Sequence, residues 1–490
     1  MKILKAAANH FVRLGFITIG AVAIHGYHLG ADDAAIYVPG IKKAADPSLF
    51  PFGSEFFMSH AQLSLFPNLV GGSARLSHAP VDLIIFLWHV LCIYLLVAGC
   101  YQVLACCFAS ERARWCGVAL VAVLLSVPVA GTALLLMDPY LTARSLSTPL
   151  TLFTIAAGVN GRWKRAVFWL VATAVIHPQM ACYAAAFLAI YAVLRARANR
   201  PAQFISASAY AAMPLVLFFH PATGAAREAL FSRTYFFVFN WTWYEWFGVF
   251  APIALLYYSA KLLKGKTKPP FCLLCRALVL FGLLGTAAAL IVEISPEFEN
   301  FARLQPMRSL HLIYVIFFAI LGALLGDYVL KRNMARWAGL FATLAAAMWL
   351  VQNATYAGSP HIEWPGGPPH NDWISAFLWV RNNTPKNAIF ALEPRYMLSR
   401  GEDAHGFRAI AERSALADEV KDSGAASLFP GLANEWQTEV RAENQEFAAR
   451  DFRTLASEYH VTWVLTRRPR PRGLTCPYKN REVAVCRVSP

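Results

Sequence analysis

The stretch Val81–Phe108, VDLIIFLWHVLCIYLLVAGCYQVLACCF, decides the fold class of this chain. It contains one charged residue, Asp82, and is longer than the roughly 20 apolar residues that a helix needs to cross a bilayer. The composition of the whole chain agrees with it. Of 490 residues, 57% are hydrophobic and 15% are charged, against about 25% charged residues in soluble domains. The sequence therefore predicts a membrane protein.

The formal net charge of +15 is unevenly distributed. From residue 357 onward, basic and acidic residues are nearly balanced, and most of the excess falls in short clusters before that point. These clusters are Lys2/Lys5/Arg13, Arg112/Arg114, Arg162/Lys164/Arg165, Arg195/Arg197/Arg200, Lys261–Arg276 and Lys331/Arg332/Arg336. Along the chain, the clusters fall at alternate membrane boundaries, as the positive-inside rule requires. The charge therefore predicts topology, and no nucleic-acid partner is expected.

Placing these clusters in the cytoplasm predicts about eleven transmembrane segments. They are 11–30, 81–108, 115–137, 145–159, 166–178, 179–194, 203–220, 246–262, 271–292, 309–330 and 337–356. The N-terminus is then cytoplasmic and the C-terminal tail is periplasmic. This charge pattern and the low cysteine content of the tail favour a bacterial inner (plasma) membrane.

Two of these segments are unusually short. The basic clusters at 162–165 and 195–200 enclose only about 30 residues, whereas two full spans need about 40. The chain is expected to turn near His177-Pro178, because proline removes a helical hydrogen-bond donor. Non-helical backbone at membrane depth is tolerated beside protein or a water-filled cavity, so the short pair predicts an outward-facing cavity.

Hydropathy also divides the chain into domains. Residues 1–356 are predicted to form a transmembrane domain whose external loop, 31–80, carries interfacial helices. A linker rich in proline and glycine covers 357–370. Residues 371–490 are predicted to form an extracytoplasmic α/β domain, long enough to hold its own core, with a disulfide between Cys476 and Cys486 if the compartment is oxidising.

Asp32 and Asp33 are the leading candidates for chemistry. Carboxylates near hydrocarbon are costly and usually serve a function. Such a pair can deprotonate an acceptor hydroxyl or hold a divalent cation. Alternatively, it caps the following segment or marks the exit of the chain into water. Tyr37 lies one turn later and would share their face on a helix.

Arginines at the outer edge form the second group of candidates. Arg144 and Arg308, with Arg303 about a turn before Arg308, offer the fixed charged fork that suits phosphate; snorkelling to lipid headgroups is the alternative. His177 is a candidate proton relay or phosphate contact, and a structural histidine is the alternative. Asp138 caps the next helix or binds polar substrate.

The tail contains no hydrolase elbow, phosphate loop or zinc pattern. Its sequence cluster of Glu393, Arg395, His405, Arg408 and Arg413 is expected to be solvated surface. No metal-ligand set is predicted anywhere in the chain.

This arrangement resembles the GT-C glycosyltransferase superfamily. The resemblance lies in Gly30-Ala31-Asp32-Asp33, the interfacial loop to Pro80, the short-helix region and the tail. It implies a polyprenyl-phosphate-linked sugar donor and transfer on the periplasmic face. Asp32 or Asp33 would be the general base, and Arg308 and Arg144 would stabilise the departing lipid phosphate. Some members use a divalent cation such as Mg²⁺ or Mn²⁺ and others do not, so the cofactor stays unknown.

Two other functions remain open at this stage. Broken helices and buried charges also mark transporters or flippases of lipid-linked or anionic solutes. Against that reading, the two halves of the chain show no internal repeat. A non-catalytic envelope scaffold is the third reading. The expected partners are a lipid-linked sugar donor and membrane lipids.

Overall fold

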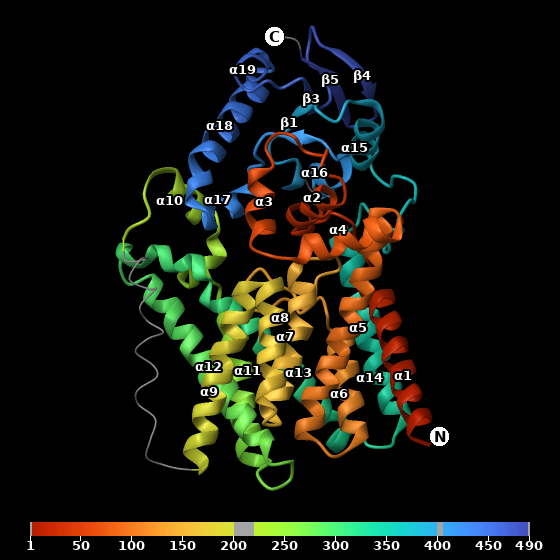
Figure 1. Ribbon diagram of the computed structural model, residues 1–490, viewed down its shortest axis with the longest axis vertical. Helices are drawn as coiled ribbons and strands as arrows, with labels where there is room; N and C mark the ends of the chain where they lie inside the picture. Colours follow the sequence, from red (N-terminus) through yellow and green to blue (C-terminus); the bar gives the residue numbers. More distant parts are fainter. Residues whose placement is uncertain (1, 200–219, 399–404, 489–490) are drawn as a thin grey trace.

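The computed structural model describes residues 2–199, 220–398 and 405–488. A helical bundle forms one end of the molecule, and a mixed sheet flanked by helices forms the other (Figure 1). The N-terminus and the connection between α11 and α12 lie at the end of the bundle away from the sheet (Figure 1).

The bundle contains ten of the described helices. These are α1 (Lys2–His25), α5 (Val81–Cys107), α6 (Glu111–Val123), α7 (Ala143–Val159), α8 (Trp163–Ile176), α9 (Pro178–Asn199), α11 (Trp243–Leu262), α12 (Pro270–Val292), α13 (Leu310–Leu324) and α14 (Met334–Thr355). Among the described residues, five segments are long and apolar enough to cross a membrane. They are Val81–Cys107, Pro178–Arg197, Pro270–Val292, Pro296–Leu330 and Met334–Thr355. The count of about eleven spans is not confirmed, and the predicted segment 203–220 lies almost entirely outside the described residues.

The predicted segment 115–137 is wrong as a continuous helix. α6 ends at Val123, and the chain then folds back on itself through a bridge between Pro128 and Leu135. Proline lacks the donor that would continue the helix. Gly131 fits closely against the ring of Trp241, where an added Cβ would lie 2.5 Å from the nearest ring atom. The irregular stretch that follows α6 carries Asp138 and leads into α7.

Helix α7 is the centre of the bundle. Every residue from Ala143 to Val159 is buried, although the helix contains three threonines and two serines. It begins at a capping box in which Thr142 and Ser145 each accept a hydrogen bond from the other's backbone N–H. This cap fixes where the helix starts, and hence the position of Arg144 at its second residue.

The break predicted near His177-Pro178 is confirmed. α8 ends at Ile176 and α9 begins at Pro178. Two backbone carbonyls at the end of α8 accept hydrogen bonds from the loop 31–80, which we call the external loop after its predicted position. Val175 O accepts from Leu65 N–H at 2.9 Å, and Ile176 O accepts from Ser64 Oγ at 2.5 Å. The loop thus satisfies a helix end that the break leaves open.

The external loop forms three short helices, α2 (Ala34–Ala45), α3 (Glu55–Gln62) and α4 (Phe66–Ser77). They lie between the bundle and the C-terminal region (Figure 1). Leu69 and Leu76 of α4 are exposed, as apolar side chains of an interfacial helix would be. Lys42 of α2 is 2% exposed and pairs with Asp82 and Glu412, so this helix faces protein.

The C-terminal region is built around a five-stranded sheet of order β2-β1-β3-β5-β4. Its elements are α15 (Asp372–Asn383), β1 (Ile389–Leu392), α16 (Phe407–Ala411), β2 (Ser414–Ala415), α17 (Asp422–Leu428), α18 (Ala433–Ala449), α19 (Arg453–Glu458), β3 (Trp463–Arg467), β4 (Thr475–Lys479) and β5 (Val483–Arg487). β2, β1 and β3 are parallel, whereas β5 runs antiparallel to β3 and β4. A disulfide between Cys476 and Cys486 links β4 to β5.

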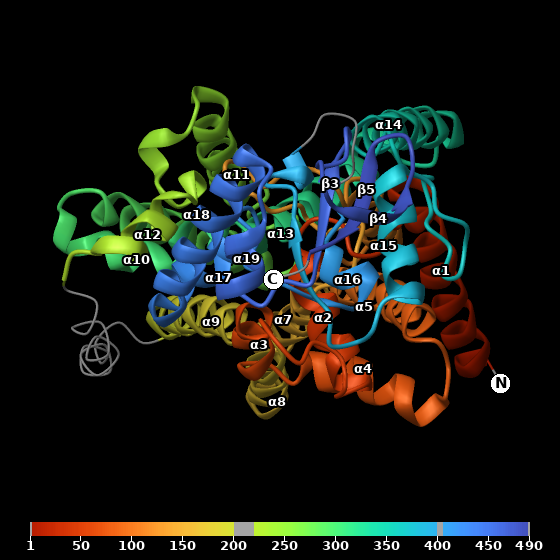
Figure 2. The same ribbon diagram turned by 90° about the horizontal axis from the view of Figure 1, so that it is seen from above.

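Both faces of the sheet are covered. Phe390 and Leu465 point to one face with Phe377 of α15, while Val464 points to the other face with Phe447 of α18. This is the two-residue alternation of a strand buried on both sides. Figure 2 shows α17 and α18 on one side of this region, with α15, β4 and β5 on the other.

Glu439 of α18 makes the stability of this region depend on pH. Burial raises the pKa of Glu439 to about 7, so the folded protein binds a proton more tightly than the unfolded chain. The free energy of unfolding should therefore fall, by at most about 1.4 kcal/mol per pH unit, as pH rises from the ordinary carboxyl value to 7. Glu439→Gln should raise the melting temperature at pH 8 and leave it unchanged at pH 4.5, as followed by thermal unfolding. Equal changes in melting temperature at pH 4.5 and at pH 8 would contradict the raised pKa of Glu439.

Candidate active site

The two aspartates lie where the chain passes from the bundle into the external loop. After α1, the segment pairs with the C-terminal half of the chain through bridges from Tyr27 to Ile362 and from Ala31 to His405. Asp32 has φ +47°, and Asp33 stands immediately before α2. The side chain of Asp33 makes no capping hydrogen bond to α2, which removes the capping alternative for this residue.

Asp32 is held from two sides. Its carboxylate accepts a hydrogen bond from the hydroxyl of Tyr140 at 3.0 Å. It also forms a close ion pair with the ammonium group of Lys421, which stands at the start of α17. Asp32 thus connects the stretch after α6 with the C-terminal region.

Asp33 faces a small cavity of about 60 Å³ at the ends of the helices. We call it the Asp33 pocket. Its lining residues are Asp33, Ile36, Tyr37, His60, Arg144, Arg233, Tyr235, Phe236, Gln305, Arg308, Lys421, Gly424 and Leu428. They come from the external loop, α7, the 233–236 segment, the stretch before α13, and α17 with the residue before it. The pocket therefore forms only when these separate segments of the chain pack together.

Four cationic side chains act on Asp33. Burial acts to raise the pKa of Asp33, but the charges of Lys421, Arg144, Arg308 and Arg233 together outweigh it and hold the pKa below its ordinary value. The carboxylate is therefore ionised at neutral pH. Lys421 is also paired with Asp32, and Arg144 with Asp138. The four cations thus exceed the three nearby carboxylates by one, and this surplus of positive charge suits an anionic ligand.

Arg144 is positioned by Asp138. Nη2 of Arg144 lies 2.5 Å from Oδ2 of Asp138 and 3.7 Å from Oδ2 of Asp33. Arg144 and Asp138 are both buried. Burial raises the pKa of Asp138 to about 6, against the opposing charge of Arg144. Asp138 therefore lies behind Arg144 and directs its guanidinium towards the pocket.

Arg308 and Arg233 each keep one N–H group available. Nη2 of Arg308 lies 3.4 Å from the hydroxyl of Tyr235, and its guanidinium lies over the Tyr235 ring. Nη2 of Arg233 donates to Val420 O and to Ser423 Oγ, both at 2.6 Å. The buried Nε atoms of both arginines have no hydrogen-bond partner among the described residues. Such orphaned donors usually find a partner, and a bound anion would supply one.

His60 and Tyr37 are two uncharged polar groups of the lining. Burial lowers the pKa of His60 to about 4, so this imidazole of α3 is neutral at pH 7. Burial raises the pKa of Tyr37, so its phenol stays protonated and can donate a hydrogen bond. Tyr37 stands one turn after Asp33 on α2, as the spacing predicts for a helix.

Five of the candidates from the sequence meet here: Asp33, Tyr37, Arg144 and Arg308 line the pocket, and Asp138 contacts Arg144. Asp32 does not line the pocket, but it is paired with Lys421, which does.

Two other candidates from the sequence have contacts outside the pocket. Nε of Arg303 donates to Ser427 O at 2.8 Å, which ties the chain before α13 to α17. Nδ1 of His177 lies 3.5 Å from the backbone N–H of Met180, at the first turn of α9.

Sequence reasoning does not predict four of the residues around the two aspartates. These are Lys421, Arg233, Tyr140 and His60. Each stands alone in a segment without a motif, and only the fold brings them to the two aspartates. The tail residues expected on the surface also need correction. His405, Arg408 and Arg413 are 2%, 8% and 5% exposed, because each is paired inside the C-terminal region or against the bundle.

The fold and the pocket define a class: a helical, membrane-type chain with a cation-rich pocket beneath a C-terminal α/β region. No known protein family and no curated protein matches the sequence. Among solved structures, the chain is similar to the arabinofuranosyltransferase AftD from Mycobacteria, at 14% identity and a TM-score of 0.42. The match covers 98% of this chain and 40% of AftD, and the likeness is one of coarse architecture.

Proposed function

We propose that this chain is a membrane glycosyltransferase of the GT-C type. It would move a sugar from a polyprenyl-phosphate-linked donor to an acceptor hydroxyl on the periplasmic face of a bacterial inner membrane. The N-terminus would lie in the cytoplasm, and the C-terminal α/β domain, 371–490, would lie in the periplasm. The donor and the membrane lipids would be its partners.

One observation carries the proposal. Asp33, an ionised carboxylate, shares its pocket with four cationic side chains that come from separate parts of the chain: Arg144, Arg233, Arg308 and Lys421. Sugar transfer from a lipid phosphate needs a base for the incoming hydroxyl and positive charge for the departing phosphate. The Asp33 pocket brings both within one small volume.

The reaction balances with these groups alone. The acceptor oxygen would form a bond to the anomeric carbon while the bond from that carbon to the phosphate oxygen breaks. The bonding electron pair leaves with the lipid phosphate, whose added negative charge the arginines and Lys421 would stabilise. The hydroxyl proton would pass to the carboxylate of Asp33.

Donor binding would also make Asp33 a stronger base. In the free protein, four cations hold the pKa of this carboxylate below its ordinary value, which makes it a weak base. A phosphate among the same cations would offset their charge and raise that pKa. The base would therefore gain strength when the donor is in place.

A divalent cation such as Mg²⁺ or Mn²⁺ does not fit the Asp33 pocket. Asp32 is paired with Lys421 and Asp33 faces Arg144, so each carboxylate already has a cationic partner. An added dication would also be repelled by the other arginines of the pocket. The proposed mechanism therefore uses no metal ion at the aspartates.

The position of the pocket favours transfer over transport. Arg144 is the second residue of α7, Arg308 precedes α13, and Asp33 precedes α2. Their charges thus lie where helices end, beside the external loop, whereas transporter sites lie near the middle of the membrane. A lipid-linked donor could place its phosphate there while its chain stays in the bilayer.

The proposal is tested by turnover. Purified protein in proteoliposomes would be supplied with a panel of radiolabelled polyprenyl-phosphate sugars and with acceptor glycans from bacterial envelopes. Label in the acceptor, with release of polyprenyl phosphate, supports the transferase. Movement of an intact lipid-linked sugar across the bilayer, without transfer, would instead favour the flippase reading.

Arg308→Gln should weaken donor binding and leave the fold intact. A charge-assisted hydrogen bond contributes about 1.5–3 kcal/mol, so the KM for the donor should rise about 10- to 100-fold. Arg227→Gln is the matched control, because Arg227 pairs with Glu299 at the surface and does not line the pocket. An unchanged KM for Arg308→Gln would remove this residue from phosphate binding.

A further inference from the structure

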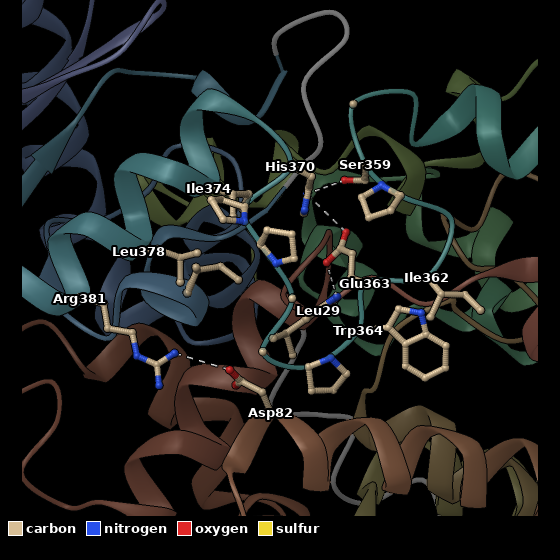
Figure 3. A pocket seen from close by; sticks show the side chains of 18 of the residues that line it. Leu29, Asp82, Ser359, Ile362, Glu363, Trp364, His370, Ile374, Leu378 and Arg381 are labelled. Carbon is tan, nitrogen blue, oxygen red and sulfur yellow. Dashed lines mark hydrogen bonds and ion pairs between the residues drawn. The ribbon is translucent and has the colours of Figure 1, made fainter.

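A second group of chemically capable side chains lies apart from the Asp33 pocket. Glu363 and His370 stand on the segment between α14 and α15, and His405 stands just before α16. Each offers one metal-binding atom, and these atoms all lie within 4.8 Å of one another. Figure 3 shows Glu363 and His370 pointing towards each other at the wall of a cavity.

The distances are those of a compact cluster. Oε1 of Glu363 lies 2.8 Å from Nε2 of His405 and 3.8 Å from Nε2 of His370. The two imidazole rings have their centres 5.5 Å apart. Side chains at these separations need only small rotations to surround one ion at ligand distances of about 2.0–2.2 Å.

The surroundings orient the carboxylate. Nδ1 of His28, which is fully buried, lies 2.9 Å from Oε1 of Glu363, and the backbone N–H of Leu29 donates to Oε2 at 2.8 Å. Metal-binding carboxylates are commonly held by such outer hydrogen bonds. His28 is further fixed by stacking on Tyr356, with ring centres 3.7 Å apart.

The donor set selects the type of ion. Two imidazole nitrogens and one carboxylate oxygen suit zinc and similar transition metals, whereas Mg²⁺ and Ca²⁺ prefer oxygen ligands. A tetrahedral ion has four ligand positions, and the three protein ligands leave one of them open. Glu363 and His370 also line a cavity of about 630 Å³, so water or a small anionic ligand could complete the shell from that side.

We propose that Glu363, His370 and His405 bind a zinc-class divalent cation. The ion would connect the segment after α14 to the chain before α16, and through the contacts of Glu363 to the segment after α1. It would thereby fasten the C-terminal region to the bundle. None of the three ligands lines the Asp33 pocket, so this site goes beyond the proposed transferase activity and does not depend on it.

The experiment measures metal content and binding in the full-length protein. Protein purified in detergent without chelator would be analysed by elemental mass spectrometry, then stripped and titrated with Zn²⁺ and with Co²⁺. We expect one ion per chain and the visible absorption of tetrahedral Co²⁺. His370→Ala should abolish both, because it removes one ligand and leaves the contacts of His28 and His405 with Glu363 in place.

His361→Ala is the control on the same segment. Its Nε2 bonds to Ala23 O, and it lies two residues from Glu363 without belonging to the cluster, so this variant should keep the ion. Thermal unfolding of each variant shows whether it folds, and Zn²⁺ should raise the melting temperature of wild type but not of His370→Ala. Wild type that binds neither ion, or binding that survives in His370→Ala, would overturn the proposal.

Discussion

Asp33→Asn should lower the rate of sugar transfer by about 10²- to 10⁴-fold, the range that a positioned general base contributes. The amide keeps the shape of the side chain but cannot take the proton of the acceptor hydroxyl. Because Asp33 makes no capping hydrogen bond to α2, the fold should survive the change. The measurement is the initial rate with saturating donor in proteoliposomes.

Two further asparagine variants make this result specific. Asp46→Asn changes an aspartate on the same external loop that pairs with Lys386 away from the pocket, and should keep full activity. Asp32→Asn should have a smaller effect than Asp33→Asn, because Asp32 acts through Lys421 and Tyr140. Full activity in Asp33→Asn, or a larger loss in Asp32→Asn, would assign the base elsewhere.

Arg144→Met should destabilise the protein by about 3–5 kcal/mol, the cost of breaking a buried ion pair. The substitution leaves Asp138 buried without the guanidinium that lies 2.5 Å from it. Burial already raises the pKa of Asp138 to about 6, and loss of Arg144 would raise that pKa further. The destabilisation should therefore be smaller at pH 5 than at pH 8, as followed by thermal unfolding in detergent.

The double variant separates stability from function. Arg144→Met with Asp138→Leu replaces the whole pair by apolar groups and should recover most of the lost stability. Sugar transfer should remain low, because the pocket still lacks the cation nearest to Asp33. A double variant that regains activity would show that Arg144 serves only the fold.

Sequence reasoning named several residues that lie together in the candidate site, because charges are rare in apolar sequence. Asp33, Arg144 and Arg308 stand at the ends of apolar segments on one predicted face, and helix ends on one face lie close together once the helices pack. The break at His177-Pro178 could be predicted from length and from proline chemistry. Both results depend on local physical rules.

The remaining parts of the site depend on tertiary contacts. Lys421 is nearly 400 residues from Asp32 in the chain, and Arg233 stands in a segment without a recognisable pattern. Nothing local indicates that α17 packs beside the external loop. Hydropathy predicts a single membrane segment over 115–137, because it averages over the turn that Pro128 and Gly131 allow.

The cluster of Glu363, His370 and His405 was missed for a different reason. Two of its members lie in a proline- and glycine-rich stretch that reads as a linker, and His405 was expected on the surface. Metal motifs are recognised by regular spacing on one helix or loop. This cluster has no such spacing, because two distant segments supply it.

The central claim is that the Asp33 pocket binds the phosphate of a lipid-linked donor. Its most direct test is an experimental structure of the protein in lipid nanodiscs with polyprenyl phosphate bound. We predict phosphate density between Arg144, Arg233, Arg308 and Lys421, within hydrogen-bond distance of the Nε atoms of Arg233 and Arg308. Phosphate bound at another place, with the pocket unchanged from the free protein, would contradict the account.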